Sequence, residues 1–157
     1  MPNSTYEHQH HMQIRLATFA DLTRITALDK QSSLTPWSYD NYLSSLNNSK
    51  HTIYLLADNN DIIGAAVIAE AADEAELLQL WIKPDGQRHG YGRKLLKDIL
   101  AKLQQHLINQ IFLEVRTDNQ AAIGLYTNLG FNSVGIRKNY YTVDSWQFDA
   151  LIMTRNI

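Results

Sequence analysis

A glycine-rich segment between two apolar runs is the feature that most limits how this chain can fold. The segment reads Gln87-Arg88-His89-Gly90-Tyr91-Gly92-Arg93. Residues 75–82 before it are strand-like, and they stop at Lys83-Pro84-Asp85-Gly86, whose Pro and Gly end regular structure. The leucines and isoleucines after it recur at helical spacing. A strand, a glycine loop and a helix in this order predict a crossover between parallel neighbours of an α/β sheet.

The same segment is suited to hold a pyrophosphate. Gly90 and Gly92 let the backbone approach an anion, the helix start offers unpaired N–H groups, and Arg88 and Arg93 add positive charge. A P-loop is excluded because no Ser or Thr follows the lysine in Arg93-Lys94-Leu95, and the dinucleotide fingerprint lacks its third glycine. A surface turn capped by glycines remains the alternative for the loop taken alone.

Composition narrows the class of protein. A chain of 157 residues with 45% hydrophobic and 19% charged residues has enough apolar material for one globular domain with a full core. The formal net charge of −2 argues against a nucleic-acid binder held by bulk positive charge. Because the chain has no cysteine, it forms no disulfide, no thiolate metal site and no cysteine acyl-enzyme. Any acyl transfer is therefore expected to be direct.

Residues 1–11 differ from the rest of the chain. They are polar and contain His8, His10 and His11, while the other histidines are scattered and offer no matching ligand set. We interpret them as a disordered or vestigial leader, with Met12 as an alternative start and 12–157 as a single domain, and we expect no metal site. No signal peptide and no apolar stretch of membrane-spanning length are found, so a cytoplasmic protein without a membrane segment is expected.

Periodicity predicts a mixed α/β fold. The expected elements are a strand at 14–16, helices capped near Thr18 and Ser38, a hairpin of 52–57 and 62–69, the strand 75–82, a helix after the glycine loop, a strand at 111–115, a helix from Asp118 or Asn119 to Gly130, and strands at 133–137 and 147–154. The apolar face of the helix after the glycine loop is expected to hold Leu95, Leu96, Ile99, Leu100, Leu103 and Leu107. Ligands in such sheets bind at the carboxyl ends of the parallel strands, which is where the glycine loop lies.

Glu114 is an unusual carboxylate within a predicted strand. Alternation puts it on the same face as Phe112 and Arg116. One interpretation is structural, a carboxylate paired with Arg116 or Arg137. The other makes Glu114 a general base, because an amine is mostly ammonium at neutral pH and attacks a thioester only after it loses a proton. The residues alone leave both interpretations open.

Tyr126 lies on the helix that follows this strand. Its spacing from Leu125 and Leu129 is typical of a packing aromatic with its hydroxyl bonded elsewhere. Its phenol is also able to protonate a departing thiolate. Asn119 is a helix cap that could in addition bind an extended ligand.

The order of several motifs resembles the GNAT acyltransferases, in particular the bacterial ribosomal-protein-alanine N-acetyltransferases of the RimI type. The motifs are Gln-Arg-His-Gly-Tyr-Gly-Arg at 87–93, Leu-Glu-Val-Arg at 113–116, Asn-Gln-Ala-Ala-Ile-Gly-Leu-Tyr at 119–126, and Leu-Gly-Phe at 129–131. Pro-Trp-Ser at 36–38 and Ile-Arg-Lys-Asn-Tyr-Tyr at 136–141 agree as well. The resemblance covers nearly everything from Ile14 onward.

The resemblance implies a GNAT fold and an activity. The fold is a mixed, mostly antiparallel sheet of about seven strands with flanking helices and a parallel pair that splays at a bulge near the acetyl-CoA site. The activity is acetyl transfer from acetyl-CoA to the N-terminal amine of a protein, an alanine of a ribosomal protein, with Glu114 as base and Tyr126 as acid. The residues implied at acetyl-CoA are Leu80, Trp81, Ile82, Arg88, His89, Gly90, Tyr91, Gly92, Arg93 and Asn119, and those implied at the peptide are Tyr140 and Tyr141.

Two departures from the family pattern bear on the acceptor. Trp81 stands where the family usually has a small residue, so its indole either faces the acyl pocket or packs in the core. Residues 142–149 also depart from the usual approach to the last strand. Two alternatives therefore remain, a GNAT enzyme acting on a small-molecule amine and a non-catalytic acyl-CoA-binding domain.

Overall fold

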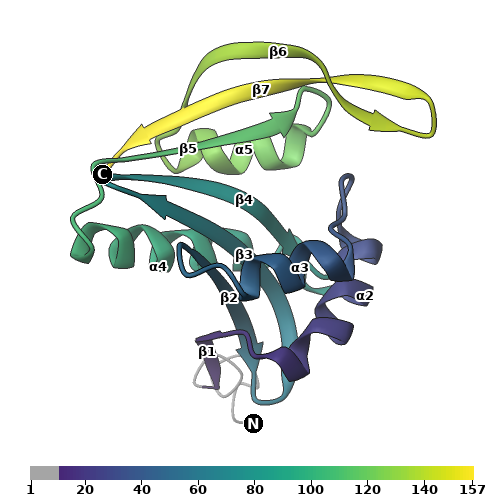
Figure 1. Ribbon diagram of the computed structural model, residues 1–157, viewed down its shortest axis with the longest axis vertical. Coiled ribbons are helices and arrows are strands. Elements are labelled where there is room, and N and C mark those ends of the chain that lie inside the picture. The colour runs from purple at the N-terminus through teal and green to yellow at the C-terminus, as the bar shows by residue number, and fades with distance from the viewer. Residues whose placement is uncertain (1–10) are drawn as a thin grey trace, which may run out of the picture.

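The computed structural model describes residues 11–157 (Figure 1), so all of the predicted leader except His11 lies outside the described residues. The strands are β1 (Met12–Leu16), β2 (His51–Asp58), β3 (Asp61–Ala71), β4 (Glu74–Ile82), β5 (Gln110–Arg116), β6 (Asn132–Val143) and β7 (Trp146–Asn156). The α-helices are α2 (Leu22–Ser32), α3 (Tyr39–Leu46), α4 (Tyr91–Gln105) and α5 (Gln120–Asn128). Short 3-10 helices are η1 (Phe19–Asp21) and η2 (Pro84–Gly86). The predicted order of elements is confirmed.

The seven strands form one sheet in the order β1-β2-β3-β4-β5-β7-β6. Every neighbouring pair is antiparallel except β4 and β5, which are parallel and joined by α4. The mixed, mostly antiparallel sheet expected from the resemblance is thus confirmed. The crossover expected from the strand, glycine loop and helix is this β4-α4-β5 unit.

The parallel pair separates partway along its length. Pairing of β4 with β5 runs only from Glu74 opposite Gln110 to Leu77 opposite Leu113. At that point the register of β4 on β3 shifts, which leaves Leu78 as an extra residue on β4. Figure 1 shows the two strands together near the C-terminus and diverging toward their other ends. A wedge therefore opens in the middle of the sheet.

The two faces of the sheet carry separate hydrophobic cores. One core packs α4 and α5 against the sheet through Leu96, Ile99, Leu113 and Tyr126. The other packs α2 and α3 against the opposite face through Ile25, Tyr42, Val67 and Trp81. Any opening between β4 and β5 is therefore bordered by different helices on its two sides.

Local chain signals account for the helix boundaries. The Ser38 hydroxyl accepts from the Asn41 N–H at 3.1 Å and starts α3, as its cap position predicts. Asn119 accepts from the Ala122 N–H at 3.2 Å, so of the two predicted caps for α5 it is the one used.

The prediction for Leu107 is wrong, because α4 ends at Gln105 and Leu107 follows it with a positive φ of 63°. The side chain is 80% exposed, while the other five residues expected on the apolar face of α4 are buried. The apolar spacing continues to Leu107, which lies beyond the end of the helix at Gln105.

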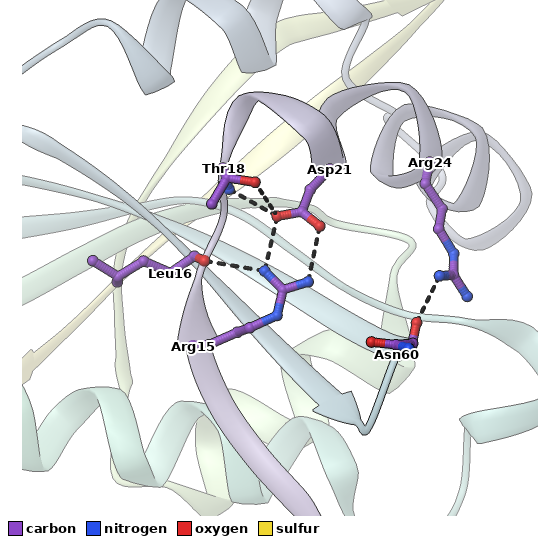
Figure 2. Close-up of polar contacts among 6 residues, drawn as sticks. All are labelled: Arg15, Leu16, Thr18, Asp21, Arg24 and Asn60. Carbon is purple, nitrogen blue, oxygen red and sulfur yellow. Dashed lines mark hydrogen bonds and ion pairs between the residues drawn. The ribbon is translucent and has the colours of Figure 1, made fainter.

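Asp21 joins the first strand to the first helix (Figure 2). Its carboxylate accepts two hydrogen bonds of 2.8 Å from the Arg15 guanidinium and one of 2.7 Å from the Thr18 N–H. The hydrogen bonds from Arg15 are the main cause that lowers the pKa of Asp21 from 3.8 to about 2. A lowered pKa in the folded state means that this stabilisation is present above the unfolded pKa and is lost as the pH falls through the folded one.

We expect Asp21→Asn to lower the free energy of unfolding at pH 7 by about 1–2 kcal/mol, allowing for solvent screening of a partly exposed pair. The difference from wild type should shrink as the pH falls below 3.8 toward about 2, since the Asp21 carboxyl then becomes protonated in the folded state as well as in the unfolded state. Urea unfolding across this range measures it. Asp61→Asn is the control, because Asp61 pairs with Lys83 at 2.9 Å but is 52% exposed and should contribute less. A loss that does not change with pH would contradict the assignment.

Candidate active site

The wedge between β4 and β5 holds a cavity of about 480 Å³. It passes from one face of the sheet to the other. Ala122, Leu125 and Tyr126 of α5 line it on the side of α4 and α5, whereas Ser33 and Thr35 of the loop between α2 and α3 line it on the opposite side. Two different molecules can thus approach the same point from opposite faces.

The glycine loop forms one end of this cavity. Gly90 precedes α4 with a φ of 77°, a left-handed conformation that favours glycine, and no side chain among the described residues caps the helix. The first N–H groups of α4 therefore lack a capping side chain. A Cβ on Gly92 would lie 3.3 Å from Leu125 Cδ2, so a glycine there lets α4 come close to α5. Together with Arg88 and Arg93, which also line the cavity, this end is suited to bind a phosphate group.

Strand β4 forms the long wall of the cavity. Leu80 and Ile82 pack toward the core of α4 and α5, and both line the cavity. Trp81 also belongs to the lining, but its side chain is 3% exposed and packs in the other core, where its indole N–H donates to the Tyr42 hydroxyl at 2.8 Å. Of the two orientations that the sequence left open for Trp81, the structure has the core one. The indole therefore does not fill the space for an acyl group.

Glu114 lies on β5 where the strands have separated. Its side chain is only 10% exposed, and Oε1 lies 2.9 Å from the Arg137 Nε, whose side chain is 57% exposed. Arg116, the other partner considered from the sequence, instead pairs with Asp118 at 2.8 Å. The ion pair of the structural interpretation is thus present, and the carboxylate also lines the cavity. Glu114 can therefore pair with Arg137 and still contact a ligand in the cavity, so the structural and the functional interpretation are compatible.

Further polar groups surround Glu114. The Tyr141 hydroxyl donates to the Glu114 carbonyl oxygen at 3.2 Å, and the Tyr140 and Tyr141 rings meet edge to face at 4.9 Å. Interaction with Glu114 raises the pKa of Tyr140, and burial raises that of Tyr141 to about 12. Burial, followed by the charge of Glu114, raises the pKa of Glu76 on β4. Two carboxylates and two neutral phenols therefore lie near one another on this side.

Tyr126 belongs to both the core and the cavity. Its ring is 6% exposed and lies 5.7 Å from the Phe131 ring, as expected of a packing aromatic, and it lines the cavity on the side of α5. Burial raises its pKa above the ordinary value of 10, with Tyr141 as a secondary cause, so its hydroxyl is protonated at neutral pH. It is available as a proton or hydrogen-bond donor.

Most residues predicted for the site come together in the cavity. Those that line it are Leu80, Trp81, Ile82, Arg88, Gly90, Tyr91, Gly92, Arg93, Glu114, Asn119, Tyr126 and Tyr141. His89 and Tyr140 are not among the lining residues, although each ring lies beside a neighbour that is, His89 at 5.7 Å from Tyr91 and Tyr140 at 4.9 Å from Tyr141. Their roles stay predictions.

Sequence reasoning missed the loop between α2 and α3 and one residue of β4. Ser32, Ser33, Leu34 and Thr35 line the cavity, and so does Gln79. A polar residue in the middle of Leu77-Leu78-Gln79-Leu80 was the available signal, because a glutamine in an apolar strand needs hydrogen-bond partners. The loop had only its Pro36 as a marker of irregular backbone.

Within residues 11–157, no group of three or more His, Asp or Glu side chains is arranged to hold a metal ion. Over the same part of the chain, no helix is both long and apolar enough to cross a membrane.

The cavity suits a long ligand with an anionic end at the glycine loop and a reactive end at the centre of the sheet. An acceptor then reaches the reactive end from the face that bears Glu114. The class of protein that this fold and site define is the acyl-CoA-dependent acyltransferases.

Comparison with known proteins narrows the class to a family. Residues 18–131 match the model of the acetyltransferase (GNAT) family. The [ribosomal protein bS18]-alanine N-acetyltransferase of Escherichia coli (strain K12) is 35% identical over 85% of this chain and 89% of its own length. The protein of the same name from Haemophilus influenzae is 39% identical over 77% of this chain and 82% of its own. The chain belongs to the GNAT acetyltransferase family, as the motifs predicted.

A solved structure agrees with the sequence comparisons. The crystal structure of the ribosomal-protein-S18-alanine N-acetyltransferase from Escherichia coli superposes with a TM-score of 0.86 at 33% identity, and covers 93% of this chain and 94% of that one. The predicted GNAT fold is thereby confirmed. GNAT enzymes use acetyl-CoA as co-substrate, which fits a cavity with one end suited to bind a phosphate and a chain without a cysteine nucleophile.

Proposed function

We propose that this protein is an N-acetyltransferase that moves an acetyl group from acetyl-CoA directly to the N-terminal amine of a protein, the alanine of a ribosomal protein. The observation that carries the proposal is similarity over most of the chain to two enzymes that bear this name. The cavity supports it, because a carboxylate and a tyrosine suited to the chemistry line the point where the strands separate.

Acetyl-CoA binds from the side of α4 and α5 in this proposal. The N-terminus of α4, with Arg88 and Arg93, holds the pyrophosphate, and Asn119 contacts the extended arm. The backbone of β4 beyond Leu77 no longer pairs with β5 and offers its polar groups to the amides and the thioester carbonyl. Bound acetyl-CoA supplies the thioester, and the chain orients it across the sheet.

The acceptor binds from the opposite face. Glu114 removes a proton from the ammonium, directly or through a water molecule, so that the amine nitrogen can form a bond to the acetyl carbon. The carbon–sulfur bond breaks, and Tyr126 gives its proton to the departing sulfur. The nitrogen loses its second proton as the amide forms, and this proton restores the neutral phenol through solvent. Two carboxylates, Glu76 and Glu114, favour a cationic acceptor on this side.

A peptide fits this face better than a small cation. Leu34 and Tyr140 are both about half exposed, one in the loop that lines the cavity and the other next to the cavity-lining Tyr141. Exposed apolar groups of this kind contact the side chains of an extended peptide. The competing functions are acetylation of a small-molecule amine and binding of acyl-CoA without catalysis. An assay with different acceptors separates them.

The test uses purified protein, acetyl-CoA and two peptides, one with a free N-terminal alanine and one with a blocked N-terminus and an internal lysine. Mass spectrometry should find one added acetyl group on the free alanine only. Acetylated lysine would contradict N-terminal specificity. If neither peptide reacts although calorimetry shows acetyl-CoA binding, a panel of polyamines and free amino acids decides between a small-molecule enzyme and a binding domain.

A further inference from the structure

A buried carboxylate, Asp29 of α2, lies beside the acceptor side of the cavity. The residue is 0% exposed, and none of the ion pairs found among residues 11–157 includes it. Removing a carboxylate from water without a cation is costly unless several hydrogen bonds replace the lost water. The groups that donate to Asp29 therefore decide whether the charge is tolerated there.

In the described part of the chain, residues 11–157, four residues donate to this carboxylate. They are the Ser33 hydroxyl, the Trp37 backbone N–H at 3.0 Å, the Tyr42 hydroxyl at 2.5 Å and the Gln79 amide, which reaches both oxygens at 3.2 and 3.0 Å. They come from three places, the loop between α2 and α3, helix α3 and strand β4. Asp29 thus joins segments that are far apart in the chain.

Strand β4 takes part through the bulge at Leu78. Beyond the bulge, Gln79 and Trp81 point to the face of α2 and α3. The Gln79 amide donates to the Thr35 carbonyl oxygen at 3.1 Å as well as to Asp29, and the Trp81 indole donates to the Tyr42 hydroxyl at 2.8 Å. The bulge at Leu78, where β4 separates from β5, therefore also turns the side chains of Gln79 and Trp81 toward this network.

The network ties together two walls of the cavity. Residues 32–35, which are the end of α2 and the start of the loop, line one wall, and Gln79 lines the other. Both lie on the face from which the acceptor reaches Glu114. The spacing between these walls is set by hydrogen bonds that meet at Asp29, because the loop makes them on one side and β4 on the other.

We propose that Asp29 is a positioning residue for the acceptor. Through Gln79 and the loop of residues 33–37, it fixes the wall against which the acceptor peptide binds, without touching the reacting atoms. This inference rests on the proposed function for the identity of the acceptor. Acetyl-CoA binds from the other face and does not depend on the network.

Two variants test the network, Asp29→Asn and Gln79→Met. In Asp29→Asn an amide NH₂ replaces one of the two carboxylate oxygens that accept from Gln79, which removes one acceptor and the negative charge and weakens the link between the walls. Gln79→Met keeps the length of the side chain but removes the donor. Because Gln79 is only partly buried, this change should disturb the fold little. We expect KM for the alanine peptide to rise about tenfold in both, while kcat and the Kd of acetyl-CoA stay within about twofold.

Asp21→Asn is the matched control. It also changes a carboxylate that binds several donors beside a helix and lowers stability, but Asp21 does not line the cavity. Its KM should equal that of wild type, which separates positioning from loss of stability. An unchanged KM in both folded variants, or the same rise in the control, would overturn the proposal.

Hydrogen exchange keeps this test separate from that of the proposed function. The backbone amides of Ser33, Leu34, Thr35 and Trp37 should exchange faster in Asp29→Asn and Gln79→Met than in wild type and Asp21→Asn, whatever the acceptor is. If wild-type protein transfers no acetyl group to the peptide, the proposed function fails, and exchange alone then decides the role of Asp29. Unchanged exchange of this segment would overturn the inference even in an active enzyme.

Discussion

Replacing Glu114 by glutamine is expected to lower kcat by about 10²–10⁴-fold, the range typical of a lost general base. Glutamine keeps the shape of the side chain and an oxygen that accepts from Arg137, whose Nε lies 2.9 Å from Oε1 in the native pair. It does not accept the ammonium proton. The loss should therefore appear in turnover of the alanine peptide, while the Kd of acetyl-CoA and the unfolding temperature stay close to wild type.

Glu76→Gln is the matched control for this prediction. Glu76 lies close enough to Glu114 for that charge to contribute to its raised pKa, but it is not among the residues that line the cavity. It should change kcat far less than Glu114→Gln does. If Glu114→Gln retains full activity, the ion pair with Arg137 is the whole role of Glu114 and another group must take the proton.

Local patterns were sufficient to predict the order of the helices and strands, while the resemblance to the GNAT family implied the mostly antiparallel sheet and its splayed parallel pair. The strand, glycine loop and helix predicted the β4-α4-β5 crossover, and polar caps at Ser38 and Asn119 marked the starts of α3 and α5. Each of these signals lies within a few residues of the feature that it determines. The end of α4 was not predicted, because Leu107 continues the helical spacing of apolar residues beyond the last helical residue, Gln105.

The contacts of β4 with helices α2 and α3 were not predicted. The bulge at Leu78 lies in a run of leucines that hides the change of alternation, so the direction of Trp81 stayed open until the register of β4 on β3 was known. Gln79 and Asp29 are 50 residues apart, and no spacing rule joins them. The motifs predicted the candidate catalytic residues. The hydrogen bonds that join Gln79 to Asp29 and to the loop between α2 and α3 could be found only in the folded chain.

Tyr126→Phe is expected to lower kcat on the order of 10²-fold, the lower end of the range for acid–base catalysis. Burial raises the pKa of Tyr126, which keeps its proton in place at neutral pH but makes it a weaker acid toward the departing thiolate. In the proposed mechanism the hydroxyl therefore contributes mainly through its position near the sulfur of bound acetyl-CoA. Phenylalanine keeps the ring that packs 5.7 Å from Phe131, so the fold should persist.

Tyr54→Phe separates catalysis from the loss of a buried hydroxyl. Tyr54 is 4% exposed and packs in the same core, burial raises its pKa as well, and it is not among the cavity-lining residues. Unfolding temperature and kcat measured for both variants should show a change of kcat in Tyr126→Phe alone. Equal kcat losses in both would mean that Tyr126 acts through packing, because Tyr54 does not line the cavity and cannot donate a proton to the sulfur.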